Sequence, residues 1–174
     1  MKRALFLILL FLIIGNIKAQ ETPTAHSIFQ RAKQEAVRSH RKIFILFQAS
    51  WCVWCHVMDS SMADASCREF FRNNYVVVHL TIQETEKNKD RENPGGMAMY
   101  TKYGGDDNEG IPYWLVFDEE GSLLADSQMR PGENAGCPAT KQEVNYFLDV
   151  LKKTSSLTPE QSKIIETRFR KNDH

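Results

Sequence analysis

Short runs of apolar residues, rich in β-branched and aromatic side chains, recur along the chain and predict the strands of a sheet. Pro112 stands where the third run opens, a position at which its missing N–H breaks no bond of a strand ladder. Gly121 lies in the turn after that run and suits the positive φ that a tight hairpin needs. The expected strands are residues 43–47, 75–82, 111–117 and 122–125.

Between these runs, apolar residues return every three or four positions and predict amphipathic helices. Asp64 is expected to cap one of them, and Thr158-Pro159-Glu160 is typical of the start of another. The polar stretch 83–93 is expected to be a solvated loop. The expected helices are residues 24–39, a helix starting at or just after Cys52, 64–73, 97–103, 139–153 and a last one from Thr158. With 174 residues, 42% of them hydrophobic and 25% charged, the chain is expected to form one globular domain.

The first residues follow a different pattern. Lys2 and Arg3 precede an unbroken apolar run over residues 4–14, and a small residue, Ala19, follows. This run is shorter than the about 20 residues that a membrane-spanning helix needs. The pattern therefore predicts a cleaved signal peptide over residues 1–19, with an uncleaved anchor as the alternative.

Composition limits the partners of the mature chain. The 174 residues carry 22 basic and 22 acidic side chains, and loss of residues 1–19 removes three basic and no acidic ones, leaving 19 against 22. Such a chain has no basic field for nucleic acid, so we expect no nucleic-acid binding.

The candidate chemistry lies directly after the first predicted strand, in Trp51-Cys52-Val53-Trp54-Cys55-His56. Two thiols separated by two residues can form a disulfide within one helical turn. A sulfur at the start of a helix lies near unpaired N–H groups and the positive end of the helix dipole, which favours the thiolate. We therefore expect Cys52 to be the nucleophile and Cys55 the resolving thiol, with no metal and no cofactor beyond this redox-active disulfide.

The other two cysteines stand alone in the sequence. Cys67 is interpreted as a buried apolar thiol, and neither it nor Cys137 supplies a second pair at the spacing of a zinc site. Export would also allow disulfides to persist.

The order of these elements around the C-x-x-C pair resembles the thioredoxin family over roughly residues 28–153. The resemblance depends on the strand leading into Ala49-Ser50-Trp51-Cys52, on the C-x-x-C pair and on Gly110-Ile111-Pro112 at the start of a later strand. It implies a thioredoxin-like three-layer α/β/α sandwich with a mixed central sheet. Its domains would be a signal peptide over 1–19, a thioredoxin-like domain over 20–156 and a C-terminal helix or tail over 157–174.

The resemblance also assigns roles outside the cysteine pair. The Ile111-Pro112 bond would be cis and would face the two sulfurs, and a substrate segment would bind along Trp51, Trp54, Ile111 and Pro112. Val53-Trp54 replaces the Gly-Pro that is common between the cysteines of this family. Leu46 occupies the position at which typical thioredoxins bury an acid.

Two residues are candidate auxiliary groups. His56 could act on the thiols electrostatically. Cys137 precedes the final family helix, which in the resembled fold starts beside the active site. Cys137 is therefore either a third sulfur that forms a regulatory or alternative disulfide, or a lone thiol in a loop.

Two other functions remain open at this stage. Cys52-Val53-Trp54-Cys55-His56 also matches C-x-x-C-H, the attachment signal of c-type haem, with His56 as one axial ligand. The second axial ligand would then be one of Met58, Met62, Met97, Met99 and Met129. A thioredoxin-like module that binds peptides without redox turnover is the other alternative.

We favour an exported thiol-disulfide oxidoreductase, periplasmic if the source is a bacterium with two membranes and otherwise secreted. Its partners would be proteins that carry thiols or disulfides and a redox partner that recharges it. We expect it to be a monomer.

Overall fold

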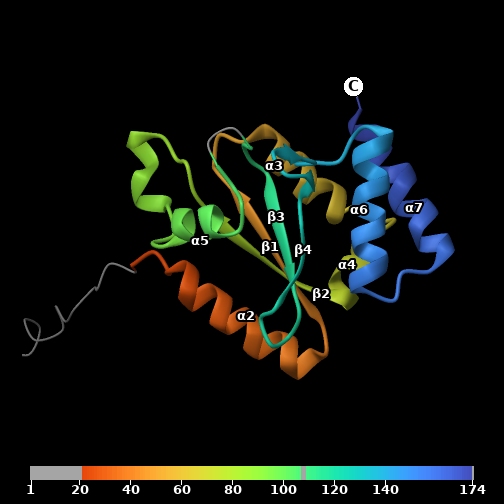
Figure 1. The fold of residues 1–174 in the computed structure, drawn as a ribbon, viewed down its shortest axis with the longest axis horizontal. Helices are drawn as coiled ribbons and strands as arrows, with labels where there is room; N and C mark the ends of the chain where they lie inside the picture. The colour runs from red at the N-terminus through yellow and green to blue at the C-terminus, as the bar shows by residue number, and fades with distance from the viewer. Residues whose placement is uncertain (1–20, 107–108, 174) are drawn as a thin grey trace, which may run out of the picture.

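The computed structural model describes residues 21–106 and 109–173, and a four-stranded sheet lies at its centre (Figure 1). The strand order is β2-β1-β3-β4. β1 pairs with β2 in parallel, and β3 runs antiparallel to both β1 and β4, so the predicted mixed sheet is confirmed. The strands are β1 (Lys42–Gln48), β2 (Tyr75–Thr81), β3 (Tyr113–Phe117) and β4 (Leu123–Asp126).

Helices cover both faces of the sheet, as the α/β/α prediction requires (Figure 1). α2 and α5 pack on one face, and α3, α4, α6 and α7 contribute to the core on the other. The α-helices are α2 (Ala25–Ser39), α3 (Val53–Met62), α4 (Arg68–Asn74), α5 (Gly96–Lys102), α6 (Lys141–Thr154) and α7 (Pro159–Phe169).

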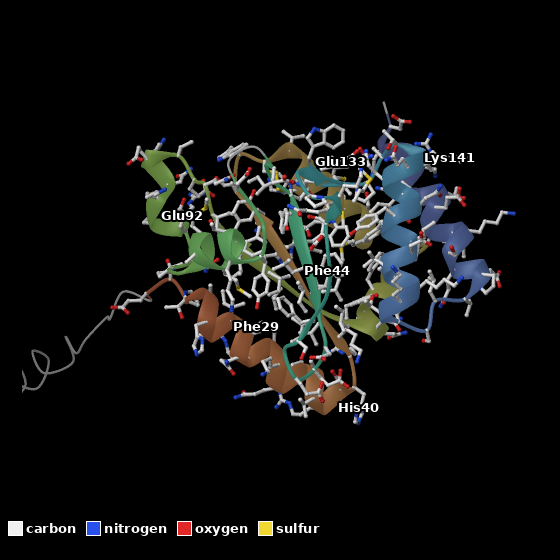
Figure 2. All side chains as sticks on the ribbon, viewed as in Figure 1. Phe29, His40, Phe44, Glu92, Glu133 and Lys141 are labelled. Atoms are coloured by element: carbon white, nitrogen blue, oxygen red, sulfur yellow. A yellow bond between two sulfur atoms is a disulfide. The ribbon has the colours of Figure 1, made fainter. Side chains whose placement is uncertain are left out.

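The alternation of side chains along β1 builds two separate cores. Phe44 and Leu46 face the core that α6 and α7 cover, while Ile43, Ile45 and Phe47 face α2 and α5. Phe44 lies in the interior between the sheet and α6 (Figure 2). Every residue from Ile43 to Phe47 is fully buried, which explains why this strand reads as an unbroken apolar run.

α7 packs on the same core as the rest of the chain. Thr158 caps it, Pro159 is its first residue, and its buried residues Ile165 and Phe169 belong to the cluster under α6. Phe169 lies 5.0 Å from the ring of Phe147, between ring centroids. Arg168 donates to the carboxylate of Asp64 across 3.0 Å, which links α7 to the turn before α4.

Two local predictions are wrong. Asp64 does not cap α4, because its side chain accepts hydrogen bonds from Ser66 and Arg168 and the helix begins only at Arg68. The stretch 83–93 is solvated as predicted except at the buried Glu84, but it is not a loop throughout, because it contains the 3-10 helix η2 (Glu86–Arg91).

Two small elements were not predicted: the two-stranded ribbon of β5 (Gln128–Arg130) with β6 (Glu133–Asn134), and the 3-10 helix η3 (Arg170–Asn172). Gly121 has a φ of +90° in the β3–β4 turn, as predicted. The expected signal peptide, residues 1–19, lies outside the described residues. Within the described residues, no helix has the length and apolar character needed to cross a membrane.

Candidate functional site

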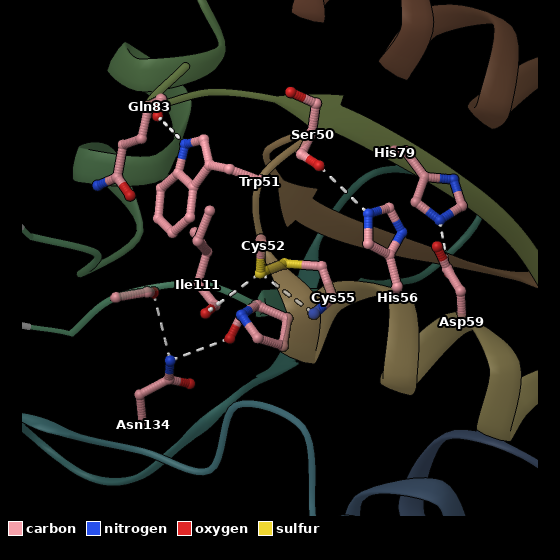
Figure 3. Close-up of a disulfide and its surroundings, with 12 residues drawn as sticks. Ser50, Trp51, Cys52, Cys55, His56, Asp59, His79, Gln83, Ile111 and Asn134 are labelled. Atoms are coloured by element: carbon pink, nitrogen blue, oxygen red, sulfur yellow. Dashed lines mark hydrogen bonds and ion pairs between the residues drawn. A yellow bond between two sulfur atoms is a disulfide. The ribbon is translucent and has the colours of Figure 1, made fainter. Parts of the chain in front are cut away.

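A disulfide joins Cys52 and Cys55 where the chain leaves β1 and enters α3 (Figure 3). Cys52 is the N-cap of α3, and its sulfur accepts the backbone N–H of Cys55 across 3.1 Å. The first turn of α3 contains no acidic residue that would oppose a thiolate. In the reduced protein, a negative charge on Cys52 would therefore be stabilised by this N–H and by the helix dipole.

The Ile111–Pro112 segment faces the disulfide. Its peptide bond is cis, and the carbonyl oxygen of Ile111 lies 3.6 Å from the sulfur of Cys52. The side chain of Asn134 holds the segment, since its Nδ2 donates to the carbonyl oxygens of Pro112 and Glu109, each across 3.0 Å. Its Oδ1 also accepts the N–H of Gly136.

Large apolar side chains surround the disulfide at the surface. Trp51, Val53 and Trp54 are exposed, whereas Cys52 is only 3% and Cys55 0% exposed. The indole N–H of Trp51 donates to the carbonyl of Gln83 across 2.8 Å, which fixes the ring over the end of β2 (Figure 3). Exposed aromatic groups around a shielded sulfur are suited to binding an apolar partner.

A cavity of about 390 Å³ adjoins this surface. Trp54, Ile111 and Pro112 form one wall, and Asn134, Cys137 and the start of α6 form others. Three of the four predicted substrate-binding residues thus line one hollow, while Trp51 contacts the end of β2 instead. Glu109 also lines it, and burial, followed by the nearby Asp106, raises the pKa of this carboxyl.

The hydrogen-bonding contacts of His56 and Cys137 are with Ser50 and Asn172 rather than with the disulfide. His56 is exposed, and its Nε2 lies 3.3 Å from the carbonyl oxygen of Ser50. Cys137 is a buried free thiol near the amide of Asn172, and burial raises its pKa to about 12. The regulatory disulfide of Cys137 is not formed here, and it stays a prediction.

Cys67 is a buried free thiol in the core, as predicted, and it donates to the carbonyl of Ser61. Burial raises its pKa as well. Both lone cysteines are therefore poor nucleophiles at neutral pH in the folded protein.

The arrangement does not favour the haem alternative, because the disulfide occupies both sulfurs that haem attachment would use. Met58 and Met62 are buried in the core rather than beside His56. Within residues 21–106 and 109–173, no three His, Cys, Asp or Glu side chains form a group that could hold a metal ion.

Sequence reasoning missed two residues of the site, Asn134 and Glu84. Glu84 is buried and accepts two hydrogen bonds from Ser50, directly before the motif. Neither residue could be found from strand alternation or motif spacing. Glu84 follows Gln83, whose φ of +53° ends the extended strand, and Asn134 lies 22 residues from Pro112 in the sequence.

Comparisons with known proteins agree with this architecture. The model of a family described as thioredoxin-like matches residues 24–119. A disulphide isomerase from Xylella fastidiosa Temecula1 is 18% identical with a TM-score of 0.52, covering 91% of this chain and 98% of that one. At identities this low, the likeness concerns the fold.

Two other solved structures are similar to a lesser degree. A DsbH oxidoreductase is 19% identical, with a TM-score of 0.44 and coverage of 79% of this chain and 92% of that one. A thioredoxin from Thermus thermophilus is 12% identical, with a TM-score of 0.46 and coverage of 71% and 82%. No curated protein sequence matches the chain.

The thioredoxin-like fold and the Cys52–Cys55 disulfide together support a thiol-disulfide oxidoreductase. The matching family model spans more than half of the 174 residues, from the start of α2 to the β3–β4 turn, and includes both cysteines and Pro112. The chain therefore belongs to the thioredoxin-like family.

Proposed function

We propose that this chain is an exported thiol-disulfide oxidoreductase that acts on protein disulfides, with Cys52 as the attacking and Cys55 as the resolving thiol. The observation that carries the proposal is the position of the Cys52 sulfur. It caps α3, accepts the N–H of Cys55 across 3.1 Å and faces the carbonyl of Ile111 at 3.6 Å.

In the reducing direction, the Cys52 thiolate attacks one sulfur of a substrate disulfide. A mixed disulfide forms, and the departing substrate sulfur takes the electron pair and a proton from solvent. Cys55 then loses its proton and attacks the sulfur of Cys52. This step closes the Cys52–Cys55 disulfide and releases the second substrate thiol. One substrate disulfide is reduced and one protein dithiol is oxidised, and the reverse sequence oxidises a substrate dithiol.

The surroundings of the disulfide support a protein rather than a small thiol as substrate. Trp51, Val53 and Trp54 form an exposed apolar rim, and the cavity beside Ile111 and Pro112 can take a side chain of an extended segment. Aromatic side chains of this kind supply much of the binding energy at protein interfaces.

A redox titration of the mature protein in glutathione buffers tests the proposal. Thiols are trapped by alkylation at each potential, and each cysteine is assigned by mass spectrometry. We expect Cys52 and Cys55 to change together at one midpoint, while Cys67 and Cys137 stay as thiols. Failure of the first two to form a reversible disulfide would overturn the proposed function.

The Cys52→Ser variant separates this function from that of a peptide-binding module. An oxidoreductase loses disulfide turnover with this change, whereas a binding module keeps its affinity for peptides and shows no turnover in the wild type either. The exposed rim of Trp51, Val53 and Trp54 is the observation that favours a peptide-binding module as the alternative.

The proposal includes export, protein substrates with thiols or disulfides, a separate recharging partner and a monomeric state. Residues 1–19 support export through their basic, apolar and small-residue pattern. Expression of the full chain in a bacterium with two membranes tests this. We expect periplasmic protein that starts at Gln20, and full-length protein that stays with the membrane would contradict it.

A further inference from the structure

A buried carboxylate lies directly beside the C-x-x-C turn. Glu84 is 6% exposed, and both of its oxygens are bonded to Ser50. Oε1 accepts the backbone N–H of Ser50 across 2.6 Å, and Oε2 accepts the Ser50 hydroxyl across 2.8 Å. A buried carboxylate is costly without partners, and hydrogen bonds to a charged group are among the stronger ones in proteins. Ser50 is therefore firmly attached to Glu84.

Glu84 is itself held by its own segment. Its backbone N–H donates to a carboxylate oxygen of Glu92 across 2.8 Å. Just before it, the N–H of Ile82 donates to the carbonyl of Gln48 across 2.8 Å, which extends the pairing of β2 with β1. Because Glu84 is held by Glu92 on one side and follows a residue paired with β1 on the other, it can set the position of Ser50 rather than follow it.

Ser50 lies inside the turn that places Cys52. The N–H of Cys52 donates to the carbonyl of Ala49 across 3.0 Å, which closes this turn around Ser50 and Trp51. The indole of Trp51 is bonded to the carbonyl of Gln83, so the turn is attached at two adjacent points to the end of β2. This attachment lies directly before Cys52, whose sulfur caps α3.

We propose that Glu84 is a positioning residue for the thiol chemistry of Cys52, acting through Ser50. It holds the turn over residues 49–52 so that the sulfur stays within reach of the N–H of Cys55. This inference rests on the proposed function. It requires that the reach of the side chain at position 84 matters more than its charge.

Two substitutions separate reach from charge. Glu84→Gln keeps the length and removes the charge, and the amide can still accept from the Ser50 N–H and donate to the Ser50 hydroxyl. Glu84→Asp keeps the charge, but it is one methylene shorter and cannot reach both groups of Ser50 without moving the turn. Glu119→Asp is a matched control, because Glu119 pairs with Lys42 at the opposite end of β1.

The measurement is the rate at which iodoacetamide alkylates Cys52 in the reduced protein, followed as a function of pH with mass-spectrometric assignment. We expect Glu84→Asp to slow the reaction about five- to tenfold at neutral pH and to shift the pH profile upward, because the thiolate loses a hydrogen bond. Glu84→Gln should stay within about twofold of the wild type, because both bonds to Ser50 remain possible. Glu119→Asp should leave the profile unchanged.

A wild-type profile in Glu84→Asp overturns the inference. A change in Glu84→Gln without one in Glu84→Asp also overturns it, because the carboxylate would then act through its charge. If Glu84→Asp does not fold, the Ser50→Ala variant tests the proposal instead, since it removes the hydrogen bond from the Ser50 hydroxyl to Glu84. It should slow alkylation in the same direction, and an unchanged profile counts against the proposal. Failure of the proposed function would appear separately, as a wild-type protein whose Cys52 and Cys55 do not cycle.

Discussion

The backbone N–H of Cys55 donates to the sulfur of Cys52 across 3.1 Å, so the two cysteines of one helical turn have different electrostatic surroundings. Only Cys52 receives this stabilisation as a thiolate, and Cys55 is fully buried behind it. After reduction, we expect Cys52 to be alkylated at least about tenfold faster than Cys55 at neutral pH, because the thiolate is the reactive form. Peptide mapping after brief labelling measures the ratio.

Cys67 serves as an internal control in that experiment, because burial raises its pKa and it should remain unlabelled. In Cys55→Ser, Cys52 should accumulate as a mixed disulfide with protein substrates, since the resolving thiol is missing. Equal labelling of Cys52 and Cys55 would contradict the assignment of the nucleophile.

The apolar rim should determine affinity for protein substrates. Trp54 is 49% exposed beside the disulfide, and Trp54→Ala should raise KM for a protein disulfide about five- to tenfold, because exposed tryptophans often dominate such interfaces. The kcat with a small disulfide such as oxidised glutathione should change little. Leu124→Ala is the control, as Leu124 is 44% exposed on β4. An equal loss with both kinds of substrate would place Trp54 in the chemistry instead.

Asn134 should stabilise the Pro112 segment. Asn134→Ala removes the donor to the carbonyls of the buried Pro112 and the half-buried Glu109, so we expect a loss of about 1–3 kcal/mol in the free energy of unfolding. Urea denaturation followed by fluorescence measures it. Asn145→Ala, at an exposed position of α6, should cost much less, and equal costs would show that the Asn134 bonds contribute little.

The thiol of Cys137 should make stability depend on pH in the alkaline range. Burial raises its pKa from 9.0 to about 12, so the folded form stays neutral where the unfolded chain already ionises. The stabilisation of the folded state that comes from keeping this thiol neutral is complete below about pH 9 and is lost as the pH rises towards 12. Cys137→Ala should therefore show a shallower fall in the free energy of unfolding across this window, by up to about 1.4 kcal/mol per pH unit. Parallel curves for the two proteins would contradict the burial of this thiol.

The last helix should be needed for stability. Phe169 is fully buried against Phe71 and Phe147, and Phe169→Ala should lower the free energy of unfolding by about 3–5 kcal/mol because it leaves a cavity. Ile164→Ala on the same helix removes a side chain that is 38% exposed and should cost well under half as much. A small effect of Phe169→Ala would indicate that α7 can separate from the core.

The centre of the sheet could be predicted because β1 and β3 are buried on both faces. β1 and β3 are apolar at every core position and therefore form unmistakable runs. The start of α4 could not be predicted in the same way. Asp64 is a good capping residue by type, but its carboxylate is used by Arg168, which lies 104 residues away. Such a competition between a local cap and a distant partner leaves no mark in the local sequence.

The cysteine pair and Ile111-Pro112 form short motifs and were found for that reason. The groups that hold them were not, because they come from elsewhere in the chain. The partner of Ser50 is Glu84, 34 residues on, and the Pro112 segment is held by Asn134 from the ribbon of β5 and β6. The sequence shows an acid in a polar stretch and an asparagine near glycines, and only the fold places each at its contact.

The parallel pairing of β1 and β2 determines which segment of the chain lies beside the cysteine turn. Because Gln48 lies opposite Thr81, both strands leave the sheet at the same edge, and whatever follows β2 stands next to the cysteine turn. The short helix Glu86–Arg91 is inserted there between Ile82 and Asn93, whose N–H groups donate to the carbonyls of Gln48 and Thr81 in the sheet. Lengthening or exchanging this insert would reshape the surface that approaching proteins meet and would leave strand register and sulfur chemistry intact. Part of the surface that meets partners is thus separable from the cysteine turn, whereas the rim of Trp51, Val53 and Trp54 belongs to that turn.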